Sequence, residues 1–336
     1  MKLSWWKASA AILAMFCGTA FAANTAVPGT LNYVEGQVSI GNQALTSKSV
    51  GSVDLNPGQT LNTTSGKAEV LLTPGVFLRM DDNSSAQMIS PNLTNTEIGL
   101  NKGRALIEVD EIHKGNNIAV KQHGATTRLL KTGLYEFNAT DNQVAVYKGE
   151  ASVVDNDKTV KVKSGHELAL DNPKLKTTKF SKDDFKKDEL YQWSDLRSSY
   201  LAEANADQAR YIVNNWYGGP GWVGAGWYWN PFFASYTFVP GDGIFSSPFG
   251  WGYYSPYWVT YAPSYYGRPY YRPGTVIAPR GGVTAARPVA PRPAAPVVHA
   301  PAPRMGGFHP APVPMSHAGA FDGTFGGYHG GVSVRH

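Results

Sequence analysis

Cysteine is nearly absent from this chain of 336 residues, in which Cys17 is the only one. A single cysteine excludes a disulfide framework within the chain and any zinc site built from cysteine pairs. Charged residues are also scarce, at 16% of the sequence against about a quarter in average soluble domains. Glycine and proline are instead abundant, with 36 and 23 residues, and aromatic residues reach 12%. This composition argues against an ordinary cytosolic enzyme and against a highly charged disordered chain.

The net charge of +5 is distributed unevenly along the chain. Residues 1–22 carry +2, residues 23–215 carry −2, and residues 216–336 carry +5 from seven arginines and two aspartates. The arginines of the last segment are scattered, and its single Arg-Gly-Gly at 280–282 is a weak nucleic-acid signal. We therefore expect no nucleic-acid partner.

Residues 1–22 have the features of a signal peptide. Two lysines give a positive start, residues 8–16 are apolar, and Ala20 and Ala22 occupy the −3 and −1 positions of a cleavage site. We expect cleavage after residue 22 and export to the periplasm, the outer surface or the medium, with an uncleaved anchor as the alternative. Cleavage removes the only cysteine, which suits an oxidising compartment. No later run of 18 apolar residues exists, so no transmembrane span is expected after cleavage.

Residues 23–175 show hydrophobic alternation with a period of two. Short runs such as Ala68-x-Val70-x-Leu72 end at turn signals such as Pro74-Gly75. Alternation with β-branched residues predicts half-buried antiparallel strands. A glycine that precedes an apolar strand and supplies a positive φ recurs at Gly36, Gly66, Gly103 and Gly149. The segment is therefore predicted to be mainly β, a two-sheet β-sandwich or a short β-roll with a core of its own.

An ordered series of short motifs in this segment resembles the FecR-domain family. The series runs as Gly36–Ile40 (GQVSI), Leu55–Thr63 (LNPGQTLNT), Gly66–Leu72 (GKAEVLL), Lys131–Phe137 (KTGLYEF) and Val144–Glu150 (VAVYKGE). The resemblance implies an all-β extracytoplasmic domain. The family is best known from iron-citrate sensing, in which this domain passes a signal from an outer-membrane receptor to a cytoplasmic sigma factor.

The N-terminus departs from the best-known members of that family. A transmembrane regulator of this kind needs an N-terminal cytoplasmic segment that binds the sigma factor, and only seven residues precede the apolar run here. We therefore expect the resemblance to hold more strongly for the fold than for the signalling role.

Residues 180–215 are predicted to be a helical connector. Ser181 with Asp184 gives a start that is similar to a capping box, and apolar residues then recur near helical spacing until Gly218. Such a helix either binds a peptide or docks Trp193 onto the β domain. We favour docking, because the apolar face of a helix is usually buried in its own chain.

Residues 216–273 change composition abruptly, since 22 of these 58 residues are aromatic and only three are charged. Disordered segments are ordinarily poor in aromatics, and the lack of clean alternation makes a second packed domain doubtful. We expect extended chain that packs on the β domain, on another copy or on an envelope surface. The candidate interaction surface consists of Trp222, Trp227, Trp229, Trp251 and Trp258. Residues 274–336 are rich in Pro, Ala and Gly, which predicts a low-complexity, disordered tail.

No constellation in the sequence supports catalysis or cofactor binding. A nucleophile elbow is missing, and the adjacent pairs Asp110-Glu111 and Asp183-Asp184 do not fit a paired-carboxylate hydrolase. Five of the eight histidines fall in the last 38 residues, spaced too widely to predict a metal site. We therefore predict no enzymatic activity, no cofactor and no metal.

Two functional hypotheses remain. The first is a non-enzymatic envelope or extracellular binding or scaffolding protein, with the FecR-like β domain as its body and the aromatic segment as its adhesive part. Its partner would be an envelope protein or a polysaccharide, together with self-association through the aromatic segment. The alternative is a periplasmic signal-transduction component that contacts an outer-membrane receptor.

Overall fold

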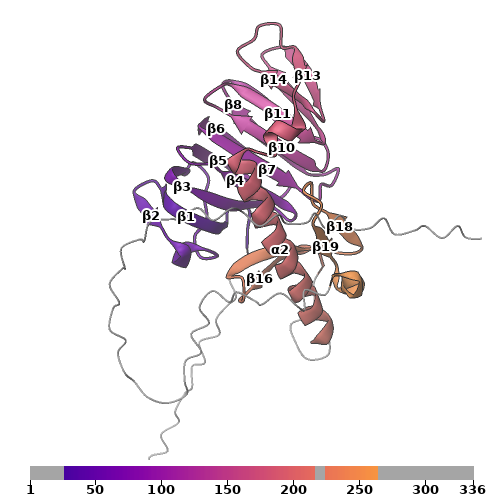
Figure 1. Cartoon of the computed structure of the whole chain (residues 1–336). Coiled ribbons are helices and arrows are strands. Elements are labelled where there is room, and N and C mark those ends of the chain that lie inside the picture. Colours follow the sequence, from indigo (N-terminus) through magenta and orange to yellow (C-terminus); the bar gives the residue numbers. More distant parts are fainter. Residues whose placement is uncertain (1–25, 216–223, 264–336) are drawn as a thin grey trace, which may run out of the picture. The chain divides into compact units, whose positions relative to one another are not determined.

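The computed structural model of the chain describes residues 26–215 and 224–263, and the predicted signal peptide, Trp222 and the predicted tail 274–336 lie outside these ranges. Fifteen strands form one continuous sheet that bends into two packed layers (Figure 1). The strands are β1 Leu31–Ile40, β2 Gln43–Leu45, β3 Thr60–Thr73, β4 Val76–Met80, β5 Ser85–Asn92, β6 Asn95–Lys102, β7 Arg104–Val109, β8 Asn117–Gln122, β9 Ala125–Leu129, β10 Gly133–Asn138, β11 Gln143–Lys148, β12 Glu150–Asp155, β13 Lys158–Lys163, β14 His166–Ala169 and β15 Thr177–Lys179. Their order is β13-β12-β9-β8-β6-β5-β3-β4-β7-β10-β11-β14-β15, and β1 pairs with β2 and β3 beside this path.

Strand β3 joins the two layers, because it is long enough to pair in both. Its first residues, Thr60–Asn62, pair with β5, and its last residues, Ala68–Thr73, pair with β4. Between them Gly66 faces Gly36 of β1. A Cβ atom on Gly66 would lie 2.3 Å from the carbonyl oxygen of Glu35, so the two backbones approach at a distance that only glycine permits.

The glycines that were expected to start strands divide into two kinds. Gly103 and Gly149 directly precede β7 and β12 and have positive φ, as predicted. Gly36 and Gly66 lie instead inside β1 and β3, where the sheet bends, and of these two Gly36 has the predicted positive φ. A glycine at a bend interrupts the hydrophobic alternation in the same way as a glycine at a turn, so the sequence did not separate the two cases.

One apolar core fills the space between the layers. It takes alternate residues of each strand, such as Val70 and Leu72 of β3 and Ile107 and Val109 of β7. All its buried members lie between residues 31 and 175. The mainly β architecture predicted from the alternation is confirmed, with one large sheet in place of two separate ones.

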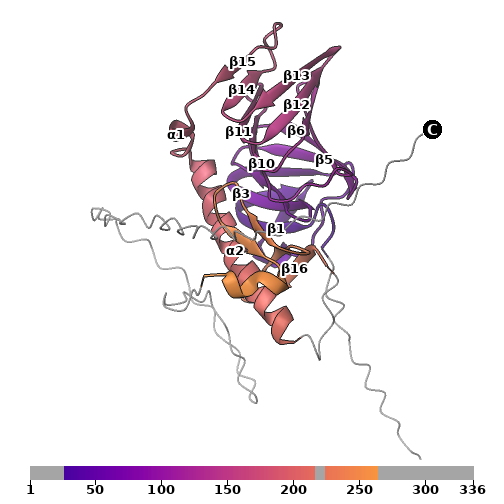
Figure 2. The same cartoon turned by 90° about the vertical axis from the view of Figure 1, so that its right-hand side faces the viewer.

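Two helices follow the sheet, α1 (Lys182–Phe185) and α2 (Glu189–Asn214). The Asp188 side chain caps α2 by accepting a hydrogen bond from the backbone N–H of Tyr191, at 3.1 Å. Helix α2 lies against the outer face of the layer that contains β3, β4, β7 and β10, as Figures 1 and 2 show. Trp193 of α2 packs on Tyr33 of β1 with ring centroids 5.9 Å apart, which is the docking that the sequence favoured. No helix within the described ranges is both long and apolar enough to cross a membrane.

The aromatic segment is more ordered than its composition predicted. It contains two β-hairpins and a short 3-10 helix, namely β16 Gly226–Asn230, β17 Ser235–Val239, β18 Ile244–Ser246, β19 Gly252–Tyr254 and η2 Pro256–Tyr261. All five residues of β17 are buried. The hairpins pack on α2 and, through Phe238 and Tyr253, on Phe77 of β4. Because aromatic side chains occupy both faces of these strands, the sequence lacks the alternation that would have revealed them.

Candidate functional site

Two of the predicted surface tryptophans anchor the first hairpin to the β domain. The ring of Trp227 packs edge-on against Phe77, with centroids 5.0 Å apart. Trp229 packs on Tyr236, and its ring lies so near Gly51 that a Cβ atom there would be 2.8 Å away. Both residues therefore attach the hairpin within the chain, although Trp229 stays 37% exposed. Their part in an interaction surface stays a prediction.

The second hairpin and η2 carry Trp251 and Trp258, the other two predicted surface tryptophans that lie within the described residues. Trp251 is 36% exposed and donates its indole N–H to Asp195 of α2, at 2.6 Å. Trp258 is 41% exposed and donates to Asp242, at 2.9 Å. Their rings remain accessible while their polar atoms are satisfied inside the chain.

A buried cluster of charged side chains lies beneath α2, where no sequence signal placed a site. It is built on three neighbouring strands, by Glu69 of β3, Arg79 of β4 and Glu108 of β7. All three side chains are fully buried. The Arg79 guanidinium pairs with Glu69 through Nε at 2.8 Å and with Glu108 through Nη1. Arg79 therefore bridges two carboxylates that would otherwise repel each other in a medium of low dielectric constant.

Helix α2 closes this cluster from above. The Arg197 guanidinium pairs with the second oxygen of Glu69 at 2.9 Å and lies 4.1 Å from the ring centroid of Tyr33. The Ser198 hydroxyl donates to Glu108 at 2.7 Å. The helix is thus fixed to the sheet by directional contacts as well as by apolar packing.

The cluster is electrically balanced only if one carboxyl is protonated. Asp110 follows β7 and is fully buried, so it adds a third carboxyl to Glu69 and Glu108, against two arginines. Burial raises the pKa of Asp110 well above its usual value, and the nearby Glu108 carboxylate raises it further. The pKa of Glu69 is lowered, because Arg197 and Arg79 outweigh the opposing effect of its burial. We assign the proton to Asp110.

Replacing Asp110 by asparagine is expected to remove a pH dependence of stability. The pKa of Asp110 in the folded chain is raised, so its favourable contribution is present at low pH and is lost as the pH rises through that value. The Asp110→Asn variant keeps the neutral shape and should lose less stability than the wild type on going from acid to alkaline pH. Urea unfolding of both proteins across this range measures the difference. If the free energy of unfolding changed with pH by the same amount in both proteins, Asp110 would not be protonated.

The first turn of α2 meets the sheet at a second, more exposed set of ion pairs. Arg104 of β7 pairs with Asp188 at 2.9 Å and with Glu136 of β10 at 3.0 Å. Lys67 of β3 pairs with Glu189 at 2.8 Å and with Asp81 at 3.5 Å. This polar junction holds the start of the helix over the bend of the sheet.

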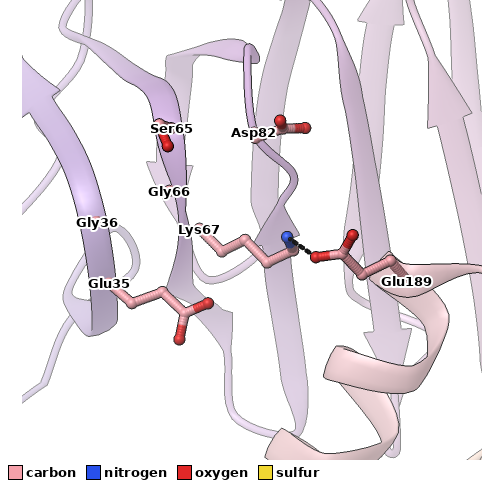
Figure 3. A pocket seen from close by; sticks show the side chains of 7 residues that line it. All are labelled: Glu35, Gly36, Ser65, Gly66, Lys67, Asp82 and Glu189. Atoms are coloured by element: carbon pink, nitrogen blue, oxygen red, sulfur yellow. Dashed lines mark hydrogen bonds and ion pairs between the residues drawn. The ribbon is translucent and has the colours of Figure 1, made fainter. Parts of the chain in front are cut away.

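An open groove of about 340 Å³ lies beside this junction. Figure 3 shows its lining, in which Lys67 reaches across to Glu189 while Glu35 and Asp82 stand at the rim. Three carboxylates and one lysine give the groove a net negative charge. Its remaining lining residues are Gly36, Ser65 and Gly66. The groove therefore presents a net negative charge beside the junction, and two of its lining residues are glycines that leave backbone accessible.

The described part of the chain contains no candidate metal site. Residues 26–215 and 224–263 contain no group of three His, Cys, Asp or Glu side chains arranged to hold an ion.

Comparison with known protein families identifies the central part of the β domain. The protein family described as FecR protein matches residues 59–152. This segment is a FecR domain. The match extends from the start of β3 into β12, so it includes the strands that carry Arg79 and Glu108.

The other comparisons add little. No curated protein matches the chain significantly. Two crystal structures of a "putative anti-sigma factor" from Parabacteroides distasonis ATCC 8503, at 2.50 and 1.65 Å resolution, are similar at 14% and 13% identity, each with a TM-score of 0.31. The similarity covers 35% and 36% of this chain and 57% and 59% of theirs, so this chain spans less than two thirds of their length.

Proposed function

We propose that this protein is a non-enzymatic relay component of the bacterial envelope, exported by its predicted signal peptide. In this proposal the FecR domain contacts a receptor-like partner protein and passes on whether that partner is engaged. The match of residues 59–152 to the FecR family supports the proposal, because the family is best known for relaying a signal across the envelope.

The observation that carries the proposal is the position of the acidic groove. It lies where the FecR domain meets the first turn of α2, and Glu189 belongs both to the groove and to the ion pair that holds the helix. A basic side chain of a partner that binds Glu35 and Asp82 would also attract Glu189 away from Lys67. Partner binding would thereby break one of the ion pairs at the start of α2, which gives the domain a way to report occupancy.

A genetic complementation experiment tests this function. A strain that lacks the protein should show altered levels of a restricted set of transcripts, and the wild-type chain should restore them. A Glu35→Lys/Asp82→Lys variant should be exported equally well and fail to restore them. Unchanged transcript levels in the deletion strain would overturn the relay role.

A scaffolding function is the second candidate, supported by the exposed aromatic rings of the hairpin segment. Phe232 and Tyr261 are each 69% exposed, well beyond what packing within the chain requires. The matched variant Phe232→Ala/Tyr261→Ala separates the two functions. It should restore transcript levels if the protein is a relay, whereas loss of envelope retention in this variant would favour scaffolding.

A further inference from the structure

The second layer of the sandwich has an outer face that no helix or hairpin of the described residues covers. Figure 2 shows α2 on one side of the sandwich and strands β5, β6, β12 and β13 on the other. The uncovered face belongs to β5, β6, β8, β9, β12 and β13. Five cations project from its last four strands or lie directly beside them, and we call them the basic sheet face: Lys121, Arg128, Lys131, Lys161 and Lys163.

The strand register places these cations at regular intervals. Arg128 of β9 is paired with Ser152 of β12, and Ser152 is paired with Lys161 of β13. Neighbouring strands are about 4.8 Å apart, so Arg128 and Lys161 stand about 10 Å apart with one small hydroxyl residue between them. On the other side Arg128 is paired with Ala119 of β8. The cations therefore rise above a floor of small side chains.

The charge of this face is not cancelled locally. Glu97 pairs with Lys121 at 2.8 Å, and Glu150 is shared by Lys131 at 2.9 Å and Lys161 at 3.5 Å. Five cations and two carboxylates leave a net charge of +3, and within the described ranges neither Arg128 nor Lys163 forms an ion pair.

The excess of positive charge on this face is separated from the rest of the domain. Residues 23–215 as a whole carry a net charge of −2, so the remaining surface is acidic. Asp155 ends β12 and Asp157 lies in the turn that follows, at the far end of the face from Lys163. The resulting field favours a negatively charged ligand that lies along the sheet.

We propose that the basic sheet face binds an acidic polysaccharide, that is, a linear sugar polymer with carboxylate or sulfate groups. A flat sheet offers a track for an extended polymer, the cations meet its charges, and Ser152 and Thr126 offer hydroxyl groups for its sugar oxygens. The apolar side chains exposed here, Leu130 and Val154, are too few to enter a lipid layer. This site is independent of the acidic groove and of the relay function.

Binding of the full mature chain to immobilised polygalacturonate and heparin tests the proposal, with neutral dextran as the reference. The Arg128→Ala/Lys163→Ala variant should bind at least about tenfold more weakly than the wild type. The matched control is Lys176→Ala/Lys179→Ala, which removes two exposed lysines at the β14–β15 edge and should change binding less than about twofold. Raising the salt concentration should weaken wild-type binding more steeply than binding of the first variant.

Three outcomes would overturn the proposal. Equal losses in both variants would show that total charge, and not this face, governs binding. Equal binding to dextran would remove the role of acidic groups. A self-associating wild type that becomes monomeric only in the Arg128→Ala/Lys163→Ala variant, without polysaccharide binding, would assign the face to a second copy of this chain. None of these outcomes bears on the transcript experiment, so the two proposals fail separately.

Discussion

Replacing Arg79 by methionine is expected to lower the free energy of unfolding by about 3–5 kcal/mol. The substitution keeps the apolar volume of the side chain but leaves the Glu69 and Glu108 carboxylates buried and facing each other without their shared cation. In a domain of this size such a loss corresponds to a fall in melting temperature of roughly 6–20 °C. Urea and thermal unfolding followed by circular dichroism measure both quantities.

Two controls show whether the effect comes from the buried charges. Arg128→Met removes an exposed arginine of the same sheet and should change stability by less than about 0.5 kcal/mol. Adding Glu108→Gln to Arg79→Met should recover much of the loss, because Glu69 keeps its ion pair with Arg197 and the uncompensated carboxylate is then gone. A single Arg79→Met variant that is as stable as the wild type would disprove the bridging role of Arg79.

Removing everything after residue 175 is expected to yield a chain that unfolds readily or aggregates, although the core between the layers is complete. The cut uncovers apolar side chains on the outer face, including Leu71, Phe77, Leu106 and Leu134, all buried beneath α2 and the hairpins. Each contributes about 1.5–3 kcal/mol by its burial, and the ion cluster becomes exposed with them. We therefore expect residues 23–175 to need α2 and the hairpins for stability, although they contain a core of their own.

The matched control for this truncation is the chain 23–263, which keeps α2 and both hairpins. It should unfold cooperatively near the melting temperature of the full mature chain. Dye binding to exposed apolar surface and the melting temperature distinguish the two fragments. If the fragment 23–175 had the same melting temperature as 23–263, α2 and the hairpins would not be needed to stabilise the β domain.

The sequence predicted the architecture well because the architecture follows local periodicity. Alternation such as that around Val70 and Leu72 marks a strand with one face in a core, and the absence of longer apolar stripes excluded helices before residue 180. The helical region after Ser181 was equally clear from its spacing, although Ser181 caps only α1 and the Asp188 cap of α2 was not predicted.

Local alternation does not predict the buried cluster of Glu69, Arg79 and Glu108. Glu69 stands between Ala68 and Val70, so alternation correctly placed it on the opposite face from the core, where a charged residue is ordinarily solvated. What covers that face is Arg197, more than a hundred residues later in the chain. Only the tertiary packing of α2 turns these residues from a surface pattern into a buried network.

Trp227 and Trp229 show the same limit for the aromatic segment. The residues around them in the sequence do not show whether an aromatic ring packs a hairpin onto its own domain or binds a partner. The distinction depends on Phe77 and Gly51, which lie in the β domain.

The shared strand β3 has a consequence for how this protein opens. Because β3 is hydrogen-bonded in both layers, neither layer is able to detach as an independent cooperative unit without breaking the strand pairs of the other. Backbone amides of β3 should therefore exchange with solvent deuterium only through global unfolding, whereas those of β15, at the end of the sheet, should exchange through local fraying. The sandwich therefore unfolds as one cooperative unit, and only its end strand β15 opens locally.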